Sequence, residues 1–168
     1  RGHHSAMPYT QLPVFMGRLA DRSAVAARAL EFLILNASRT SEVLGARWNE
    51  ISGEIWTIPA ERMKTGIAHS VPLAPAALQA LNGLERGLPE DFVFGGQKPG
   101  SPLSNMSMEM LLRRMGADEY TVHGFRSSFK DWAADCTEFP DEISEEALAH
   151  IVGSKVRRAY RRGEALDR

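Results

Sequence analysis

Apolar residues recur at helical spacing through the first part of the chain. In residues 10–19, and again in residues 23–36, they fall at the three- and four-residue intervals that place side chains on one face of a helix. Ser23 is a candidate N-terminal cap for the second of these helices. A third, short helix is expected over residues 38–46, which puts Arg39 in its N-terminal turn.

The pattern then changes from helical spacing to that of strands. Residues 54–58 alternate and are rich in β-branched side chains, which predicts a strand, and residues 69–73 are its expected partner. Between them, residues 59–68 form a turn-rich connection that carries Lys64. A small antiparallel sheet with a mobile hairpin tip is therefore expected.

Helical patterns return in the second half of the chain. A short buried segment is expected at residues 92–94, and a loop rich in glycine and proline follows at residues 95–102. The expected helices are residues 75–84, a segment from a Ser104 or Asn105 cap to Met115, and residues 123–134, 144–150 and 155–162. Because helices far outweigh strands and strands do not alternate with helices, the predicted fold class is α+β, mostly helical, with one small antiparallel sheet.

Length and composition are those of one globular domain. The chain has 168 residues, of which 43% are hydrophobic and 24% are charged. Its single cysteine, Cys136, excludes an internal disulfide framework, and no apolar run is long enough to span a bilayer. Residues 1–7 are interpreted as the remnant of an expression tag, which removes His3 and His4 from the candidate metal ligands.

The net charge of −1 argues against a protein that grips nucleic acid through an overall positive charge. Its distribution weakens that objection. Acidic residues gather in residues 138–146, whereas residues 155–162 are almost purely basic. The local field governs contacts with phosphate, so a nucleic-acid partner stays open.

Tyr160 lies among four arginines near the end of the chain. Those arginines are Arg157, Arg158, Arg161 and Arg162. A phenol is a poor nucleophile at neutral pH, and cationic neighbours favour its phenolate form and attract anions. With histidines available for proton transfer, such a tyrosine is suited to covalent attack on a phosphodiester. The alternative is a tyrosine on an amphipathic helix whose arginines face water.

Further cations and proton donors stand in separate segments of the chain. They are Arg39, Lys64, His123 with Arg126, and His150. Each alone has an ordinary structural explanation. Arg39 can simply pair with Glu42 across one helical turn, Lys64 can be a surface lysine, and His150 lies among apolar residues where core histidines are common.

Metal and nucleotide chemistry lack support in the sequence. His69, His123 and His150 are far apart and show no zinc-like spacing, and no acidic cluster suggests a two-metal site. No glycine-rich phosphate loop is present. If phosphate chemistry occurs, arginines and a lysine must neutralise the developing charge, and no metal or cofactor is expected.

Taken together, these segments resemble the catalytic domain of the tyrosine recombinases and, more narrowly, the integrases of prophages and genomic islands. The resemblance begins near Pro8 and runs to the end of the chain. It is carried, in the family's order and spacing, by residues 36–44, 56–65, 122–129, 148–150 and 158–163.

The resemblance implies a role for each candidate residue. Arg39 and Arg126 would clamp the non-bridging oxygens of the scissile phosphate through bidentate bonds that lysine cannot reproduce. Glu42 would orient Arg39. His123 and His150 would bond the phosphate and assist proton transfer.

The remaining roles implied by the resemblance concern bond breaking. Tyr160 would attack phosphorus and form a 3′-phosphotyrosyl link, and Lys64 would protonate the 5′-oxygen that leaves. The reaction would be site-specific recombination, the integration or excision of a prophage or genomic island. It would use no metal or high-energy cofactor, because the covalent link preserves the phosphodiester energy.

The resemblance also implies domains and partners. Residues 8–168 would be an integrase catalytic domain, truncated at its C-terminus and without the family's N-terminal DNA-binding domains. The partner would be double-stranded DNA at attachment sites, contacted by the arginines around Tyr160, with self-association on DNA in the full-length protein. No membrane partner is expected, and the location would be the bacterial cytoplasm, at the nucleoid.

Three alternatives remain open from the sequence. A type IB topoisomerase would share the covalent chemistry, although His123 favours a recombinase because the topoisomerase pattern usually has lysine there. A catalytically silent DNA-binding or directionality module would keep the fold without using Tyr160. A helical domain without phosphate chemistry would form no covalent link to DNA.

Overall fold

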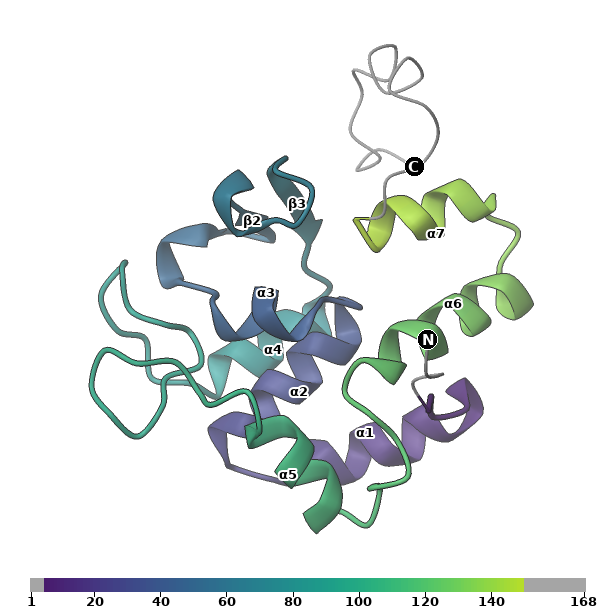
Figure 1. Cartoon of the computed structure of the whole chain (residues 1–168), viewed down its shortest axis with the longest axis horizontal. Coiled ribbons are helices and arrows are strands. Elements are labelled where there is room, and N and C mark those ends of the chain that lie inside the picture. Colours follow the sequence, from purple (N-terminus) through teal and green to yellow (C-terminus); the bar gives the residue numbers. More distant parts are fainter. Residues whose placement is uncertain (1–4, 150–168) are drawn as a thin grey trace.

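The computed structural model describes residues 5–149, and helices dominate that part of the chain (Figure 1). The helices are α1 (Leu12–Ala20), α2 (Val25–Leu35), α3 (Thr40–Leu44), α4 (Pro75–Asn82), α5 (Ser107–Arg114), α6 (Gly124–Cys136) and α7 (Asp141–Ala147). Short 3-10 turns are η1 (Tyr9–Gln11), η2 (Trp48–Glu50) and η3 (Ala60–Arg62). With the small sheet described below, this confirms the predicted α+β class.

Helix α2 is the centre of the core. It packs against α1, α3, α4 and α5, and most of its residues are apolar, as burial on several sides requires. The Phe32 ring lies 5.2 Å from the Trp56 ring and 5.5 Å from the Phe94 ring, measured between centroids. These contacts join α2 to the sheet and to the buried segment that was expected at residues 92–94.

The sheet has three antiparallel strands in the order β1 (Ile51–Ser52), β2 (Ile55–Ile58) and β3 (His69–Pro72). The pairing of β2 with β3 confirms the expected hairpin. Strand β1 was not expected. Its two residues are too few to show alternation, and Gly53, with a φ of 57°, makes the tight turn that returns the chain into β2.

Two predicted helix caps are wrong. Ala24, not Ser23, holds the cap position of α2, and no side chain bonds the free amides there. Helix α5 begins at Ser107 after Met106, not directly after Ser104 or Asn105. The Ser104 hydroxyl instead accepts a hydrogen bond from the Met106 backbone amide at 3.2 Å, and Met106 is the residue just before the helix.

Helix α7 begins earlier and ends earlier than expected. It runs from Asp141 to Ala147, whereas residues 144–150 were predicted. Pro140 supplies the extended entry, and Asp141 and Glu142 fill the first turn, where acidic side chains favour the helix dipole. The last expected helix, residues 155–162, lies outside the described residues.

Helices α6 and α7 lie beside each other, across from α3 and the β2–β3 hairpin (Figure 1). Lys130 on α6 pairs with Glu145 on α7 and, at 3.9 Å, with Asp141. Phe125 stacks on Phe15 at 5.6 Å, which fixes α6 on α1. Arg126, in the first turn of α6, bonds the Ala37 carbonyl just before α3, so the start of α6 lies near the start of α3.

Residues 5–7 pack on the start of α6. The Ser128 hydroxyl donates a hydrogen bond to the Met7 carbonyl at 2.5 Å, and the Thr121 backbone amide donates one to the Ser5 carbonyl at 3.1 Å. A Cβ on Gly124 would lie 2.2 Å from the Ser5 carbonyl oxygen, so this approach needs glycine. The origin of residues 1–7 as a tag stays a prediction, although residues 5–7 pack against the domain.

Candidate phosphate-binding site

Arg39 stands at the start of α3, as the sequence predicted. It holds the cap position in an extended conformation, and the Glu42 carboxylate accepts two hydrogen bonds from it. One Glu42 oxygen accepts the Arg39 backbone amide at 2.9 Å, and the other accepts its guanidinium at 2.7 Å. Because Glu42 is only 4% exposed, this pair fixes both the helix start and the direction of the Arg39 side chain.

Arg126 lies in the first turn of α6 and is 6% exposed. Its guanidinium donates to the Ala37 carbonyl, just before α3, and to the Leu148 carbonyl, just after α7, the latter at 2.8 Å. One side chain therefore joins three elements that are far apart in the sequence. A planar guanidinium with several donors can serve two carbonyls at once, which an ammonium does less well.

The two arginines belong to one electrostatic site. Burial and the like charge of Arg39 lower the pKa of Arg126 to about 10, against the opposing influence of Glu42 and Glu145. Arg126 stays protonated at neutral pH. Because Arg126 bonds the Ala37 carbonyl, two residues before Arg39 in the chain, the two positive side chains share the region at the starts of α3 and α6, where an anion is favoured.

His69 also belongs to this site, although no pattern in the sequence indicates it, since this histidine lacks zinc-like spacing with the others. It begins β3, opposite Ile58, and is half-buried. Burial lowers the pKa of His69, and Arg39 and Arg126 lower it further. The negative charge of Glu42 and a hydrogen bond with the Ala147 backbone act in the opposite direction. His69 is therefore a residue of the hairpin that faces the arginine pair and the end of α7.

His123 immediately precedes α6, in the cap position, which confirms the expected helix start. Its side chain is exposed, and its carbonyl accepts the Arg126 amide at 3.2 Å. His123 and Arg126 thus occupy the same turn. Because His123 is on the surface next to a buried arginine, it is accessible to a ligand of the pair.

Lys64 is exposed on the β2–β3 connection, two residues after η3. Within residues 5–149, no hydrogen bond or ion pair joins Lys64 to the arginine pair. The structure therefore places Lys64 on the expected hairpin without bringing it to the arginines. His150, Tyr160 and the arginines at positions 157, 158, 161 and 162 lie outside the described residues.

Residues 5–149 contain no group of three or more histidine, cysteine or acidic side chains arranged to hold a metal ion. Within the same range, no helix has the length and apolar character needed to cross a membrane. One pocket of about 480 Å³ is lined by Trp48, Arg86 and Phe92 among others, and none of the candidate site residues lines it.

Comparison with known proteins agrees with this geometry. The fold is that of a tyrosine recombinase catalytic domain: the catalytic core of lambda integrase matches with a TM-score of 0.61 at 17% identity, over 90% of this chain and 94% of that one. The sequence model of the phage integrase family matches residues 7–165. The chain belongs to the phage integrase family.

Individual relatives are consistent with that assignment. Prophage integrase IntA of Escherichia coli (strain K12) is 34% identical over 166 residues, which cover 94% of this chain and 40% of IntA. The chain thus spans well under half the length of this curated relative. A lambda integrase dimer bound to a COC′ core site matches with a TM-score of 0.65 at 16% identity, over 100% of this chain and 62% of that one.

Proposed function

We propose that this chain is the catalytic domain of a site-specific DNA recombinase that integrates or excises a mobile element through a covalent tyrosyl–DNA intermediate. The observation that carries the proposal is the Arg39–Arg126 pair, two guanidinium groups from separate helices held at one site. Membership of the phage integrase family and the prophage integrase relative support it.

The arginine pair suits a phosphodiester in a reaction that gathers negative charge on phosphorus. Each guanidinium can donate two parallel hydrogen bonds to the non-bridging oxygens, and this geometry stabilises the transition state more than the ground state. Glu42 keeps Arg39 in that direction, and the Ala37 and Leu148 carbonyls hold Arg126. Positive charge supplied in this way does what metal ions do at other phosphoryl-transfer sites.

In the proposed first step, the Tyr160 oxygen bonds to phosphorus and the bond from phosphorus to the 5′-oxygen breaks. The phenol gives up its proton to a histidine, His123 or His150, and Lys64 protonates the leaving 5′-oxygen. The products are a 3′-phosphotyrosyl link and a free 5′-hydroxyl. In the second step, the 5′-hydroxyl of the partner strand attacks phosphorus and gives its proton to Lys64, while the bond from phosphorus to the Tyr160 oxygen breaks and the histidine returns a proton to the phenolate.

The proposed substrate is double-stranded DNA at attachment sites, contacted in part by the arginines that flank Tyr160. The lambda integrase neighbour forms a dimer on its core site, and we infer that the full-length protein containing this chain also assembles on DNA. Such a substrate places the activity in the bacterial cytoplasm, at the nucleoid.

The test is a recombination assay with the full-length protein, a chelator and two DNA duplexes that carry the attachment sites of its own mobile element. The proposal predicts joined products in which a strand of one duplex is linked to a strand of the other. Relaxation of supercoils without exchange between duplexes would favour a topoisomerase. Binding without any strand cleavage would favour a silent DNA-binding module.

A further inference from the structure

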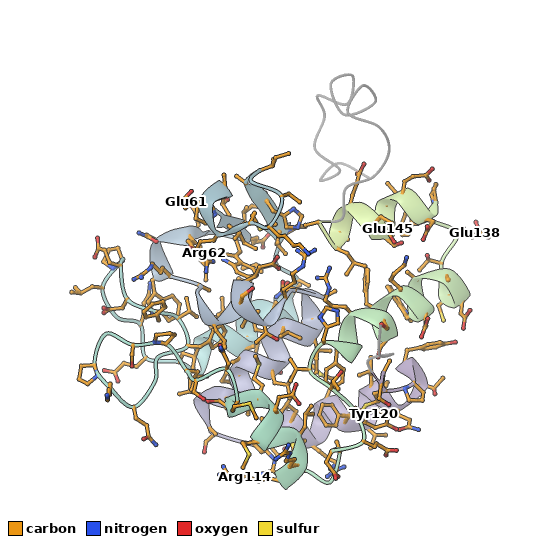
Figure 2. The ribbon with its side chains drawn as sticks, viewed as in Figure 1. Glu61, Arg62, Arg114, Tyr120, Glu138 and Glu145 are labelled. Carbon is orange, nitrogen blue, oxygen red and sulfur yellow. The ribbon has the colours of Figure 1, made fainter. Side chains whose placement is uncertain are left out.

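Arg62 connects the base of the β2–β3 hairpin to α3, a role that no sequence pattern predicts. It ends η3, and Figure 2 shows it on the inner side of the hairpin while its neighbour Glu61 lies at the outer edge. Its guanidinium donates to the Glu42 carbonyl at 3.3 and 3.4 Å and to the Glu50 carboxylate at 2.8 Å. One side chain therefore bonds both α3 and the turn that leads into the sheet.

These bonds are shielded from water. The Arg62 side chain is 21% exposed and the Glu50 side chain 8%. The same Glu50 oxygen also accepts the Trp56 indole N–H at 3.0 Å, so the carboxylate holds Arg62 and strand β2 together. A partly buried ion pair with a second hydrogen bond is stronger and more rigid than an exposed one.

The chain leaves space for Arg62 at Gly45. A Cβ built at Gly45 would lie 2.0 Å from an Arg62 terminal nitrogen and 3.2 Å from its guanidinium carbon. Gly45 has a φ of −87°, which any residue can adopt, so the backbone conformation does not require glycine here. A Cβ at this position would instead displace the end of the Arg62 side chain.

The position of Arg62 connects two parts of the proposed site. On one side it bonds the carbonyl of Glu42, whose carboxylate holds Arg39. On the other side it is two residues before Lys64, with Met63 between them buried at 5% exposure. A shift of Arg62 would therefore move the start of the segment that carries Lys64 relative to the arginine that receives the phosphate.

We propose that Arg62 is a positioning residue: it fixes the hairpin on α3 so that Lys64 can reach the leaving 5′-oxygen when DNA is bound. This inference rests on the role of Lys64 under the proposed function. It predicts that loss of Arg62 impairs protonation of the leaving group in particular, and not binding of the phosphate.

The test compares two DNA substrates with the full-length protein, one ordinary and one in which sulfur replaces the bridging 5′-oxygen at the scissile phosphate. A thiolate leaves without being protonated, so the sulfur substrate does not need a general acid. The variants are Arg62→Lys, which loses the forked donor geometry, and Gly45→Ala, which keeps every charge and displaces Arg62. Lys64→Ala is the reference for loss of the acid, and Arg22→Lys is the matched change at an exposed arginine.

On the ordinary substrate, we expect Arg62→Lys and Gly45→Ala to slow covalent cleavage at least about tenfold, part of the roughly hundredfold or more that general acids contribute. On the sulfur substrate, both should cleave at a rate close to the parent, as Lys64→Ala should. Arg22→Lys should match the parent on both substrates.

Equal slowing of Arg62→Lys and Gly45→Ala on both substrates would overturn the inference, because it would show a purely structural role. Parental rates on the ordinary substrate would overturn it too. If the sulfur substrate failed to rescue Lys64→Ala, the role of Lys64 and the inference built on it would both fall. If the parent formed no covalent product with either substrate, the proposed function itself would be refuted.

Discussion

Glu42→Gln removes the negative charge that holds Arg39 while keeping the size of the side chain. In the parent, the two carboxylate oxygens accept the Arg39 amide at 2.9 Å and its guanidinium at 2.7 Å. A glutamine can keep one of these bonds through its oxygen, but its NH2 group then faces a guanidinium that also donates. The change therefore loses one charge-assisted bond at a site that is 4% exposed.

The expected cost follows from that loss. A hydrogen bond to a charged group contributes about 1.5–3 kcal/mol, so we expect Glu42→Gln to lower the free energy of unfolding by about 2 kcal/mol. For a domain of this size, that corresponds to a drop in Tm of roughly 4–8 °C. Urea unfolding followed by circular dichroism measures the first quantity, and thermal unfolding measures the second.

Glu61→Gln is the matched control, because Glu61 is exposed on η3 and the same chemical change there should alter stability by less than about 0.5 kcal/mol. If Glu42→Gln unfolded at the same urea concentration as the parent, the Glu42 carboxylate would not be holding the start of α3. The assignment of Glu42 as the residue that orients Arg39 would then be refuted.

Two further predictions concern the same site. The ammonium of Arg126→Lys serves the Ala37 and Leu148 carbonyls less well than the forked guanidinium, so urea unfolding should show a loss of about 1–3 kcal/mol, and an unchanged midpoint would contradict the bridging role. Burial lowers the pKa of His69 below its usual value near 6.5, so the unfolded chain binds more protons between the folded pKa and that value, and stability falls as pH falls through this window. His69→Gln should reduce the difference in unfolding free energy between pH 7.5 and pH 5.5, and an equal difference in parent and variant would exclude His69 as its source.

The helices of the fold could be predicted because their apolar spacing is a local property of the chain. The central helix α2 and the hairpin of β2 and β3 are predicted in this way, as is the position of Arg39 at a helix start. Strand β1 could not be, because two residues carry no periodicity and their strand geometry comes from pairing with β2.

The residues of the candidate site fall into two similar groups, those that the sequence indicates and those that only the folded structure reveals. Arg39, His123 and Arg126 are candidates because the order and spacing of their segments resemble those of the tyrosine recombinases. His69 and Arg62 could not be found in this way, because a lone histidine in a strand and a lone arginine in a turn have no distinctive spacing. Their roles arise only when the hairpin folds over α3, which brings together residues about 20 or more positions apart, such as Arg62 and Glu42.

The most direct test of the proposed chemistry uses a DNA substrate nicked close to the scissile phosphate of the element's own attachment site, so that the cleaved strand cannot be rejoined. The full-length protein and its Tyr160→Phe variant are incubated with this DNA in the presence of a chelator and resolved on a denaturing gel. We predict a covalent protein–DNA band for the parent that is absent for Tyr160→Phe, with the DNA linked at its 3′ end to the peptide that contains Tyr160. A band that persists in Tyr160→Phe, or no band from a protein that recombines the same site, would contradict the account.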